Sequence, residues 1–140
     1  MNLNAIHHAK SQLHWENPLL NPEFVADLTT IISPYATAVG ISELFQRVPP
    51  PTGLQVITSW KSDSLLSGAA DPEVLRVVEE YGGRLYLHDR IHLKLYVCSS
   101  HHAVLSTGNL TSNGLGFSSR PNIEASAIVE LQSDDWNRIA

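Results

Sequence analysis

The chain has 140 residues, of which 43% are hydrophobic, and its mean hydropathy is -0.07. This length fits one domain, so we expect residues 1–140 to form a single globular unit, and we leave open that it is the N-terminal part of a longer protein. No apolar run approaches the roughly 18 residues that a membrane-spanning helix needs, and the N-terminus lacks the basic start and apolar core of a secretory signal. We therefore expect a cytoplasmic protein that does not engage a membrane.

The charge balance is acidic, because nine Lys and Arg stand against fourteen Asp and Glu, which gives a net charge of -5. Domains that bind nucleic acid through its phosphate backbone are typically basic, so this balance argues against a strong nonspecific grip on nucleic acid. It leaves room for a locally positive cleft, because Arg90, Lys94 and Arg120 lie within or near the polar stretch at residues 92–109. The one cysteine, Cys98, can form no disulfide within the chain, which agrees with a reducing compartment.

Helical and strand patterns alternate in the first half of the chain. Helices are predicted where apolar residues recur at helical spacing after an N-cap or an early proline, as after Asn21-Pro22 and Asp71-Pro72. Runs rich in β-branched residues predict strands. We expect helices at residues 2–14 and 22–32, a short strand at 36–41 followed by one helical turn through residue 45, a strand at 54–60, and a helix from residue 73 to the glycines at 82–83.

Three strand candidates follow one another closely in the second half, at residues 84–88, 91–98 and 103–107. The links between them are too short for crossover helices, so we expect at least the second and third to be antiparallel. A further strand is predicted at 123–131, and a helix begins at Asp134. Strands that first alternate with helices and then follow as hairpins predict an α/β domain with a mixed β-sheet flanked by helices.

The stretch from Ile91 to Val97 alternates apolar and polar residues. Period two is typical of a half-buried strand, so His92, Lys94 and Tyr96 are predicted to share one face of it. Twelve residues after Lys94 the chain continues Ser106-Thr107-Gly108-Asn109. The two stretches together supply an imidazole, an ammonium and a carboxamide, which are groups that can hold and attack a phosphodiester.

His92-x-Lys94, followed by Asn109 seventeen residues after the histidine, resembles the HKD motif of the phospholipase D superfamily. That motif reads His-x-Lys, four residues, Asp, six residues, then Gly-Ser-x-Asn, and the spacing here has no gap. The continuation at residues 110–116 and the later Asn122-Ile123-Glu124 are similar to members with nuclease activity. The resemblance implies one phospholipase D-like catalytic domain with the α/β/α sandwich of that superfamily.

Three positions depart from the motif. Ser99 stands where the motif has Asp, Ser106 where it has Gly, and Thr107 where it has Ser. Thr107 keeps the hydroxyl of the motif Ser. The change from Gly to Ser106 requires only a backbone conformation that serine can adopt. Ser99 removes a carboxylate that the family uses structurally, so we expect it to affect local rigidity more than the reaction.

The resemblance also implies a role for each polar residue. A neutral imidazole is a competent nucleophile near neutral pH, and a covalent phosphohistidine divides one difficult displacement into two easier ones. The scheme requires no metal and no cofactor, and Cys98, His101 and His102 are too few ligands for an expected zinc site. The implied catalytic residues are the nucleophile His92, the oxyanion donors Lys94 and Asn109, and Glu124, which orients the imidazole; the implied phosphate-binding residues are Lys94, Thr107 and Asn109. Arg120, in the loop at residues 118–121, is expected from its charge to contact a substrate phosphate as well.

A second imidazole is needed to protonate the leaving alkoxide. The chain has seven histidines but one His-x-Lys motif, so we expect the second imidazole to be His92 of another copy, across the two-fold axis of a homodimer. The sequence therefore predicts a homodimeric, metal-independent phosphodiesterase, a nuclease that hydrolyses nucleic acid, with DNA as the expected substrate. Two alternatives stay open: a phospholipase D-type lipid phosphodiesterase, and a non-catalytic DNA-binding module of a larger defence or repair protein.

Overall fold

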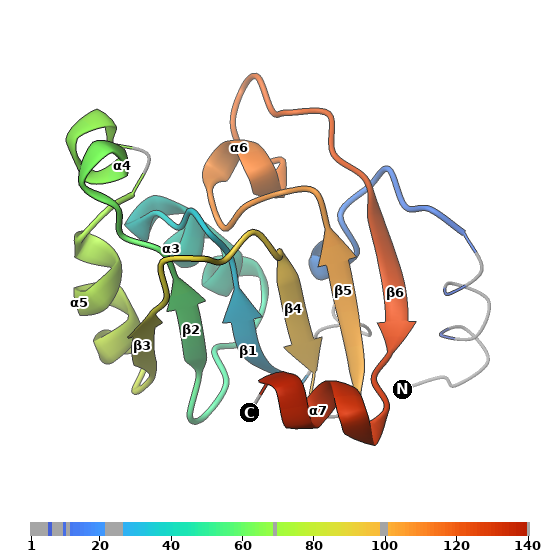
Figure 1. Cartoon of the computed structure of the whole chain (residues 1–140). Helices are drawn as coiled ribbons and strands as arrows, with labels where there is room; N and C mark the ends of the chain where they lie inside the picture. The colour runs from blue at the N-terminus through green and yellow to red at the C-terminus, as the bar shows by residue number, and fades with distance from the viewer. Residues whose placement is uncertain are drawn as a thin grey trace.

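The computed structural model describes residues 6, 10, 12–21, 27–68, 70–98 and 101–139. Strands in these ranges form one six-stranded mixed sheet in the order β3-β2-β1-β4-β5-β6 (Figure 1). The strands β1, β2 and β3 run parallel, whereas β4, β5 and β6 are each antiparallel to the preceding neighbour in that order. Their bounds are Leu28–Ile32 (β1), Gln55–Thr58 (β2), Arg84–Leu87 (β3), Leu95–Cys98 (β4), His102–Ser106 (β5) and Ser126–Glu130 (β6).

Helices cover both faces of this sheet. On one face α3, α5 and α6 bury the larger cluster of apolar side chains, and on the other face α7 packs against a smaller cluster (Figure 1). The arrangement confirms the predicted fold class, an α/β domain with a mixed sheet flanked by helices. Within the described ranges, no helix has the length and apolar character that a bilayer crossing requires. The helices are η1 (Pro18–Leu20), α3 (Ala38–Arg47), α4 (Ser62–Ser67), α5 (Glu73–Glu80), α6 (Ser112–Leu115) and α7 (Ser133–Ile139).

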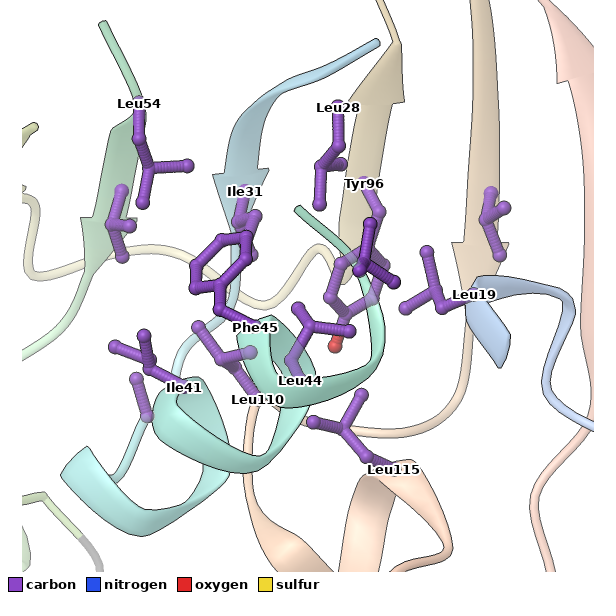
Figure 2. Close-up of a cluster of buried hydrophobic side chains, with 14 of the residues drawn as sticks. Leu19, Leu28, Ile31, Ile41, Leu44, Phe45, Leu54, Tyr96, Leu110 and Leu115 are labelled. Atoms are coloured by element: carbon purple, nitrogen blue, oxygen red, sulfur yellow. The ribbon is translucent and has the colours of Figure 1, made fainter. Parts of the chain in front are cut away.

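The larger core is built on one row of side chains that crosses the sheet. Ile31 pairs in register with Val56 and Tyr96, and the row continues through Val104 to Ile128. Residues paired in register point to the same face of a sheet, and all five are buried. Figure 2 shows side chains that cover this row, including Ile41, Leu44 and Phe45 of α3, and Leu110 and Leu115.

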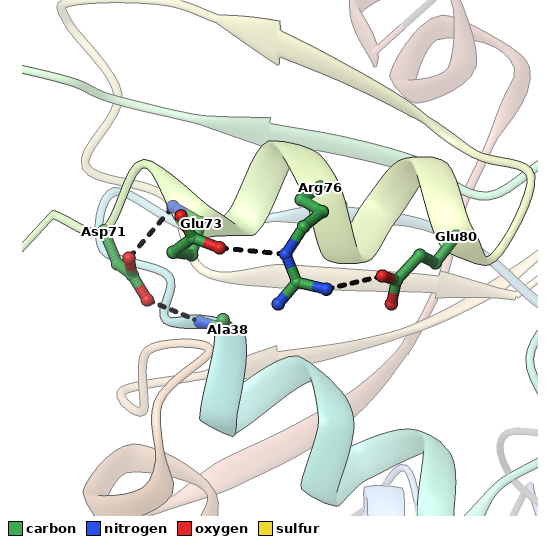
Figure 3. Close-up of polar contacts among 5 residues, drawn as sticks. All are labelled: Ala38, Asp71, Glu73, Arg76 and Glu80. Atoms are coloured by element: carbon green, nitrogen blue, oxygen red, sulfur yellow. Dashed lines mark hydrogen bonds and ion pairs between the residues drawn. The ribbon is translucent and has the colours of Figure 1, made fainter.

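Asp71 joins the starts of the two longer helices on this face (Figure 3). Its Oδ2 accepts a hydrogen bond from Ala38 N at 2.9 Å, and its Oδ1 accepts one from Glu73 N at 3.0 Å. A carboxylate at a helix N-terminus satisfies amide donors that have no partner inside the helix, so one side chain fixes how α3 and α5 begin relative to each other. Along α5, Arg76 pairs with Glu73 and Glu80 on the exposed side, where ion pairs add little stability.

Two predictions for the first half are wrong. Residues 28–32 were predicted as the end of a helix, but they form β1, which lies inside the sheet between β2 and β4. Residues 38–41 were predicted as part of a strand, but they begin α3, because the Thr37 hydroxyl accepts a hydrogen bond from Gly40 N at 3.1 Å and caps the helix. The helix predicted at 2–14 lies largely outside the described residues, and its last three residues are not helical.

In the second half, β3, β5 and β6 overlap their predicted ranges, and β4 and β5 are antiparallel as predicted. The prediction of a strand over 91–98 is wrong at its start, because β4 begins only at Leu95 and residues 91–94 form an irregular segment. All four β4 residues are buried, since helices cover both faces of the sheet. Tyr96 therefore lies in the core and does not share a polar face with the exposed His92.

Candidate functional site

One end of the sheet collects the loops that carry the motif, and we call it the site end. There β1 and β5 end while β4 and β6 begin, because Ile32 pairs with Leu95 and Ser106 pairs with Ser126. The parallel strand β2 ends there too (Figure 1). The topology therefore brings together segments that are far apart in the sequence.

A hollow of about 150 Å³ lies at the site end, and we call it the inner pocket. His92 and Lys94 both line it, so the two motif residues are brought together although neither lies within a strand. The ammonium of Lys61 is a second cation in its lining, and no carboxylate is among the described residues that line it. The pocket is therefore locally positive in a chain whose net charge is -5. Its lining consists of Pro34, Tyr35, Ser59, Lys61, Ser64, Ile91, His92 and Lys94.

A larger hollow of about 510 Å³, the outer groove, adjoins the inner pocket because His92 and Lys94 line both. Residues from the end of β5 also border the outer groove, so the two halves of the motif face the same space. A backbone hydrogen bond from Ser106 N to Lys94 O, at 3.1 Å, continues the β4–β5 ladder up to the motif. The lining of the outer groove consists of His92, Leu93, Lys94, Leu105, Ser106 and Thr107.

The reactive groups of His92 and Lys94 are available to a ligand. The His92 side chain is exposed, and among the described residues its ring nitrogens have no hydrogen-bond partner. The Lys94 ammonium makes one long contact, of 3.4 Å, to the carbonyl oxygen of His92. An ammonium has three N–H donors, so at least two remain for the oxygens of a phosphate.

Glu124 contacts Thr107 rather than His92. The Thr107 hydroxyl donates a hydrogen bond to Glu124 Oε2 and accepts one from Ala125 N at 3.0 Å. A hydroxyl has a single proton to donate, so in this arrangement Thr107 has no side-chain donor for a phosphate. The predicted phosphate contact of Thr107 would require its bond to Glu124 to break, and Glu124 acts here on the wall of the outer groove rather than on the imidazole.

Asn109 is held through Ser33, which directly follows β1. The buried Ser33 hydroxyl donates to Tyr35 O at 2.6 Å and accepts from Leu110 N at 3.0 Å, and it lies 3.4 Å from Asn109 Oδ1. The carboxamide nitrogen of Asn109 has no partner in the described part of the chain, so both of its N–H groups can donate to phosphate oxygens. Asn109 lines neither the inner pocket nor the outer groove, and Ser33 links its carboxamide to the backbone of Tyr35, which lines the inner pocket.

The buried Tyr96 supports the turn that leads to Asn109. Its hydroxyl donates a hydrogen bond to Gly108 O at 3.1 Å. Burial raises the pKa of Tyr96 far above its ordinary value, and the negative charge of Glu124 raises this pKa further. The phenol therefore stays protonated and remains a donor to the turn.

Helix α6 packs so closely against this turn that two glycines are required. A Cβ at Gly108 would lie 2.2 Å from Gly114 O, and a Cβ at Gly114 would lie 2.3 Å from Asn109 O. Both distances are far below ordinary van der Waals contact, which is 3.4–4 Å. The position of Asn109 thus depends on the absence of side chains at Gly108 and Gly114.

Arg120, which was singled out from the sequence, is not brought to this site. Arg120 is exposed in the loop between α6 and β6 and lines neither the inner pocket nor the outer groove. Its predicted contact to the substrate phosphate therefore has no support in the geometry. Ser99, which replaces the motif Asp, lies outside the described residues.

A third hollow, of about 300 Å³, adjoins the outer groove at Ser106. Two carboxylates, those of Glu16 and Glu124, line it, and neither lysine nor arginine is among its described lining residues. Negative charge disfavours a phosphate there, so among these three hollows the linings of the inner pocket and the outer groove suit an anion better.

Four residues of this region that the sequence did not single out follow β1 and β2, namely Ser33, Tyr35, Ser59 and Lys61. Because residues 28–32 were assigned to a helix, the carboxyl ends of two adjacent parallel strands were not recognised. Such ends are where ligands bind in open α/β sheets. The signal available in the sequence was the cation Lys61 shortly after the predicted strand at 54–60.

Comparisons with known proteins assign no family to the chain, because no known family profile and no curated protein matches it. Among solved structures, it is similar to TrmBL2, an archaeal chromatin protein whose structure shows a novel mode of DNA binding. The TM-score is 0.42 and the sequence identity is 12%. The match covers 91% of this chain and 48% of TrmBL2, so the chain spans about half the length of that protein. A likeness of this size indicates neither family nor function.

Proposed function

We propose that the protein is a metal-independent phosphodiesterase of the phospholipase D type, and that it is a nuclease with DNA as its substrate. The observation that carries the proposal is the meeting of His92, Lys94 and the turn before Asn109 at one end of the sheet. There an imidazole and an ammonium, both with open hydrogen-bonding positions, line two hollows that no described carboxylate lines, and the carboxamide of Asn109 follows the turn that borders one of them. This set of groups suits a phosphodiester, which carries negative charge on its non-bridging oxygens.

The reaction divides into two displacements at phosphorus. In the first, a ring nitrogen of His92 forms a bond to phosphorus while the bond to the leaving oxygen breaks, and an acid protonates that oxygen. In the second, water attacks phosphorus and gives a proton to the group that acted as the acid, the nitrogen–phosphorus bond breaks, and both imidazoles return to their starting states. Lys94 and Asn109 donate to the non-bridging oxygens throughout, where charge must be held in both transition states.

The acid of the first step is supplied by a second copy of the chain. Among the described residues that line the inner pocket and the outer groove, His92 is the one histidine. Its side chain is exposed, so a two-fold axis at the site end would let two His92 side chains face one substrate. A homodimer thus completes the pair of imidazoles that the reaction needs.

Nucleic acid is favoured over lipid because of the charge at the site end. Lys61 and Lys94 both line the inner pocket, and two ammonium groups suit a substrate that presents phosphates in series. A lipid phosphodiester presents a single phosphate to the same two cations.

The test is cleavage of plasmid and single-stranded DNA in EDTA by the wild type, His92→Ala and the control His88→Ala. His88 is exposed and lines neither hollow. We expect cleavage to survive EDTA, to disappear in His92→Ala and to persist in His88→Ala, and light scattering to give the mass of a dimer. Full activity of His92→Ala would overturn the mechanism, and full activity of a strict monomer would overturn the shared site. Phosphatidylcholine vesicles, assayed in parallel, test the lipid alternative.

A further inference from the structure

We propose that the inner pocket is a second phosphate subsite, in which Lys61 binds the phosphate next to the one that His92 attacks. The substrate would then be a strand that carries phosphates in series, and an isolated phosphodiester would use only part of the site. This inference rests on the proposed function and deepens it. The role of Lys61 is distinct from that of the motif residues, because it follows β2 and not the β4–β5 hairpin.

The positive charge of Lys61 is not neutralised by any residue that the structure describes. Lys61 is exposed and precedes α4, and no described residue forms an ion pair or a side-chain hydrogen bond with its ammonium. The two displacements at phosphorus do not use it either. A cation placed beside the nucleophile and left without a counter-ion attracts an anion of the substrate.

A buried hydroxyl on the same pocket also lacks a partner. Ser59 is 5% exposed and lines the inner pocket, and its Oγ has no hydrogen-bond partner among the residues that the structure describes. Buried polar groups in folded proteins are nearly always hydrogen-bonded, so an orphaned hydroxyl at a pocket indicates a missing acceptor. Serine moves between staggered rotamers, and rotation about χ1 would let this hydroxyl donate to a phosphate held by Lys61. Ser64, which is 8% exposed, adds a further hydroxyl to the lining.

The two hollows give such a strand a path. They meet at His92 and Lys94, so a phosphate under attack at this junction has the outer groove on one side and the inner pocket on the other. The inner pocket has a volume of about 150 Å³, roughly that of five waters at about 30 Å³ each. That space admits a phosphate group, and Lys61 is the cation that it would meet.

The binding test separates this subsite from catalysis. Fluorescence anisotropy of a fluorescein-labelled oligothymidylate is measured over a range of salt concentrations with His92→Ala alone and with His92→Ala combined with Lys61→Met. The matched control adds Arg84→Met instead, because Arg84 is an exposed cation at the start of β3, at the opposite end of the sheet. We expect Lys61→Met to weaken binding about tenfold and to reduce the slope of log Kd against log salt by about 0.7, the value for one phosphate contact on a single strand. Arg84→Met should change neither.

The kinetic test uses substrates with one and with many phosphates. Lys61→Met should lower kcat/KM for an oligothymidylate about tenfold and leave kcat/KM for the dinucleoside monophosphate TpT within about twofold. An equal loss on TpT would place Lys61 at the attacked phosphate and overturn the second subsite. An unchanged salt slope and affinity in Lys61→Met, or an equal loss in Arg84→Met, would also overturn it. If the Lys61 effect on binding holds while the wild type cleaves nothing, the proposed function fails and the subsite stands.

Ser59 provides an independent check, because it is a neutral donor. Ser59→Ala should weaken oligothymidylate binding and leave the salt slope unchanged, since no counterion is released at a hydroxyl. The free protein should not lose thermal stability, because the substitution removes a hydroxyl that has no partner. If Ser59→Ala lowers the Tm and binds oligothymidylate as tightly as the parent protein, Ser59 has a structural role only and does not bind a phosphate.

Discussion

Gly114→Ala tests whether the contact between α6 and the turn at Asn109 sets the geometry of the site. The new Cβ would lie 2.3 Å from Asn109 O and 2.6 Å from Asn109 N, against an ordinary contact of at least 3.4 Å. The difference between 3.4 Å and 2.3 Å is about 1.1 Å, and both partners are backbone atoms that cannot rotate away. Helix α6 and the turn must therefore separate by about 1 Å.

The expected magnitude follows from that displacement. Overpacking of this kind costs about 1–3 kcal/mol of folding free energy, which for a domain of this size lowers Tm by about 3–10 °C. A misplacement of about 1 Å in a group that positions the substrate can reduce the rate by about 100-fold. We therefore expect a modest loss of stability together with a large loss of kcat for DNA cleavage.

The assay compares differential scanning calorimetry and DNA cleavage for Gly114→Ala and the control Gly116→Ala. Gly116 has a φ of +84° and no atom within 4 Å of its added Cβ, so alanine there costs about 1 kcal/mol through backbone strain alone. Gly116 ends the same helix without contacting Asn109. We therefore expect Gly116→Ala to cleave DNA at nearly the wild-type rate at temperatures below the Tm of the variant. The reasoning is refuted if Gly114→Ala keeps both its Tm and its rate, or if Gly116→Ala loses as much activity.

Three further predictions concern the supports of the fold and the site. Asp71→Ala should lower the free energy of unfolding in urea by about 1–2 kcal/mol, and Asp71→Asn, which keeps one acceptor, by less; equal stability of all three proteins would contradict the double cap. Tyr96→Phe leaves the carbonyl oxygen of Gly108 without its donor, so Tm and cleavage should both fall, at a cost of about 1–3 kcal/mol, and an unchanged Tm would count against this support. Burial raises the pKa of Cys98 to about 12, and Asp27 adds to the shift, so the native thiol should react with Ellman's reagent far more slowly than the unfolded one. Because the unfolded thiol ionises first, near 9.0, stability should fall as pH rises above that value, and this slope should be smaller in Cys98→Ala.

The sequence predicted strands best where their two ends are marked and worst at the middle of the sheet. Residues 55–58 and 84–87 follow glycine-containing turns, and the sequence predicts both strands. The sequence pattern of β1, in contrast, predicts a helix. Four of its five residues are buried, because helices cover both faces and the strand has neighbours on both edges. A strand in that position has no polar alternation, and an apolar run cannot be told from a buried helix by periodicity alone.

The sequence predicts candidate residues for the site, but it does not predict what surrounds them. His92, Lys94 and Asn109 were identified from spacing, and the first two do line the same hollows. The bond from Thr107 to Glu124 could not be foreseen, because it depends on how β5 ends beside the start of β6. Lys61 could not be placed either, since its approach to the motif depends on the order of strands in the sheet rather than on distance along the chain.

The pairing of β4 with β5 gives a physical meaning to the spacing of the motif. Leu95 faces Leu105 and Val97 faces Ala103, and the same register joins Lys94 to Ser106. The residues between the two halves of the motif thus form the antiparallel pair of β4 and β5, together with the turn that connects them. Residues added at the tip would lengthen this interval and leave the two halves of the motif opposed, whereas one residue added within either strand would turn its side chains to the other face. Natural variation in such chains must therefore preserve the lengths of β4 and β5, rather than the number of residues between Lys94 and Ser106.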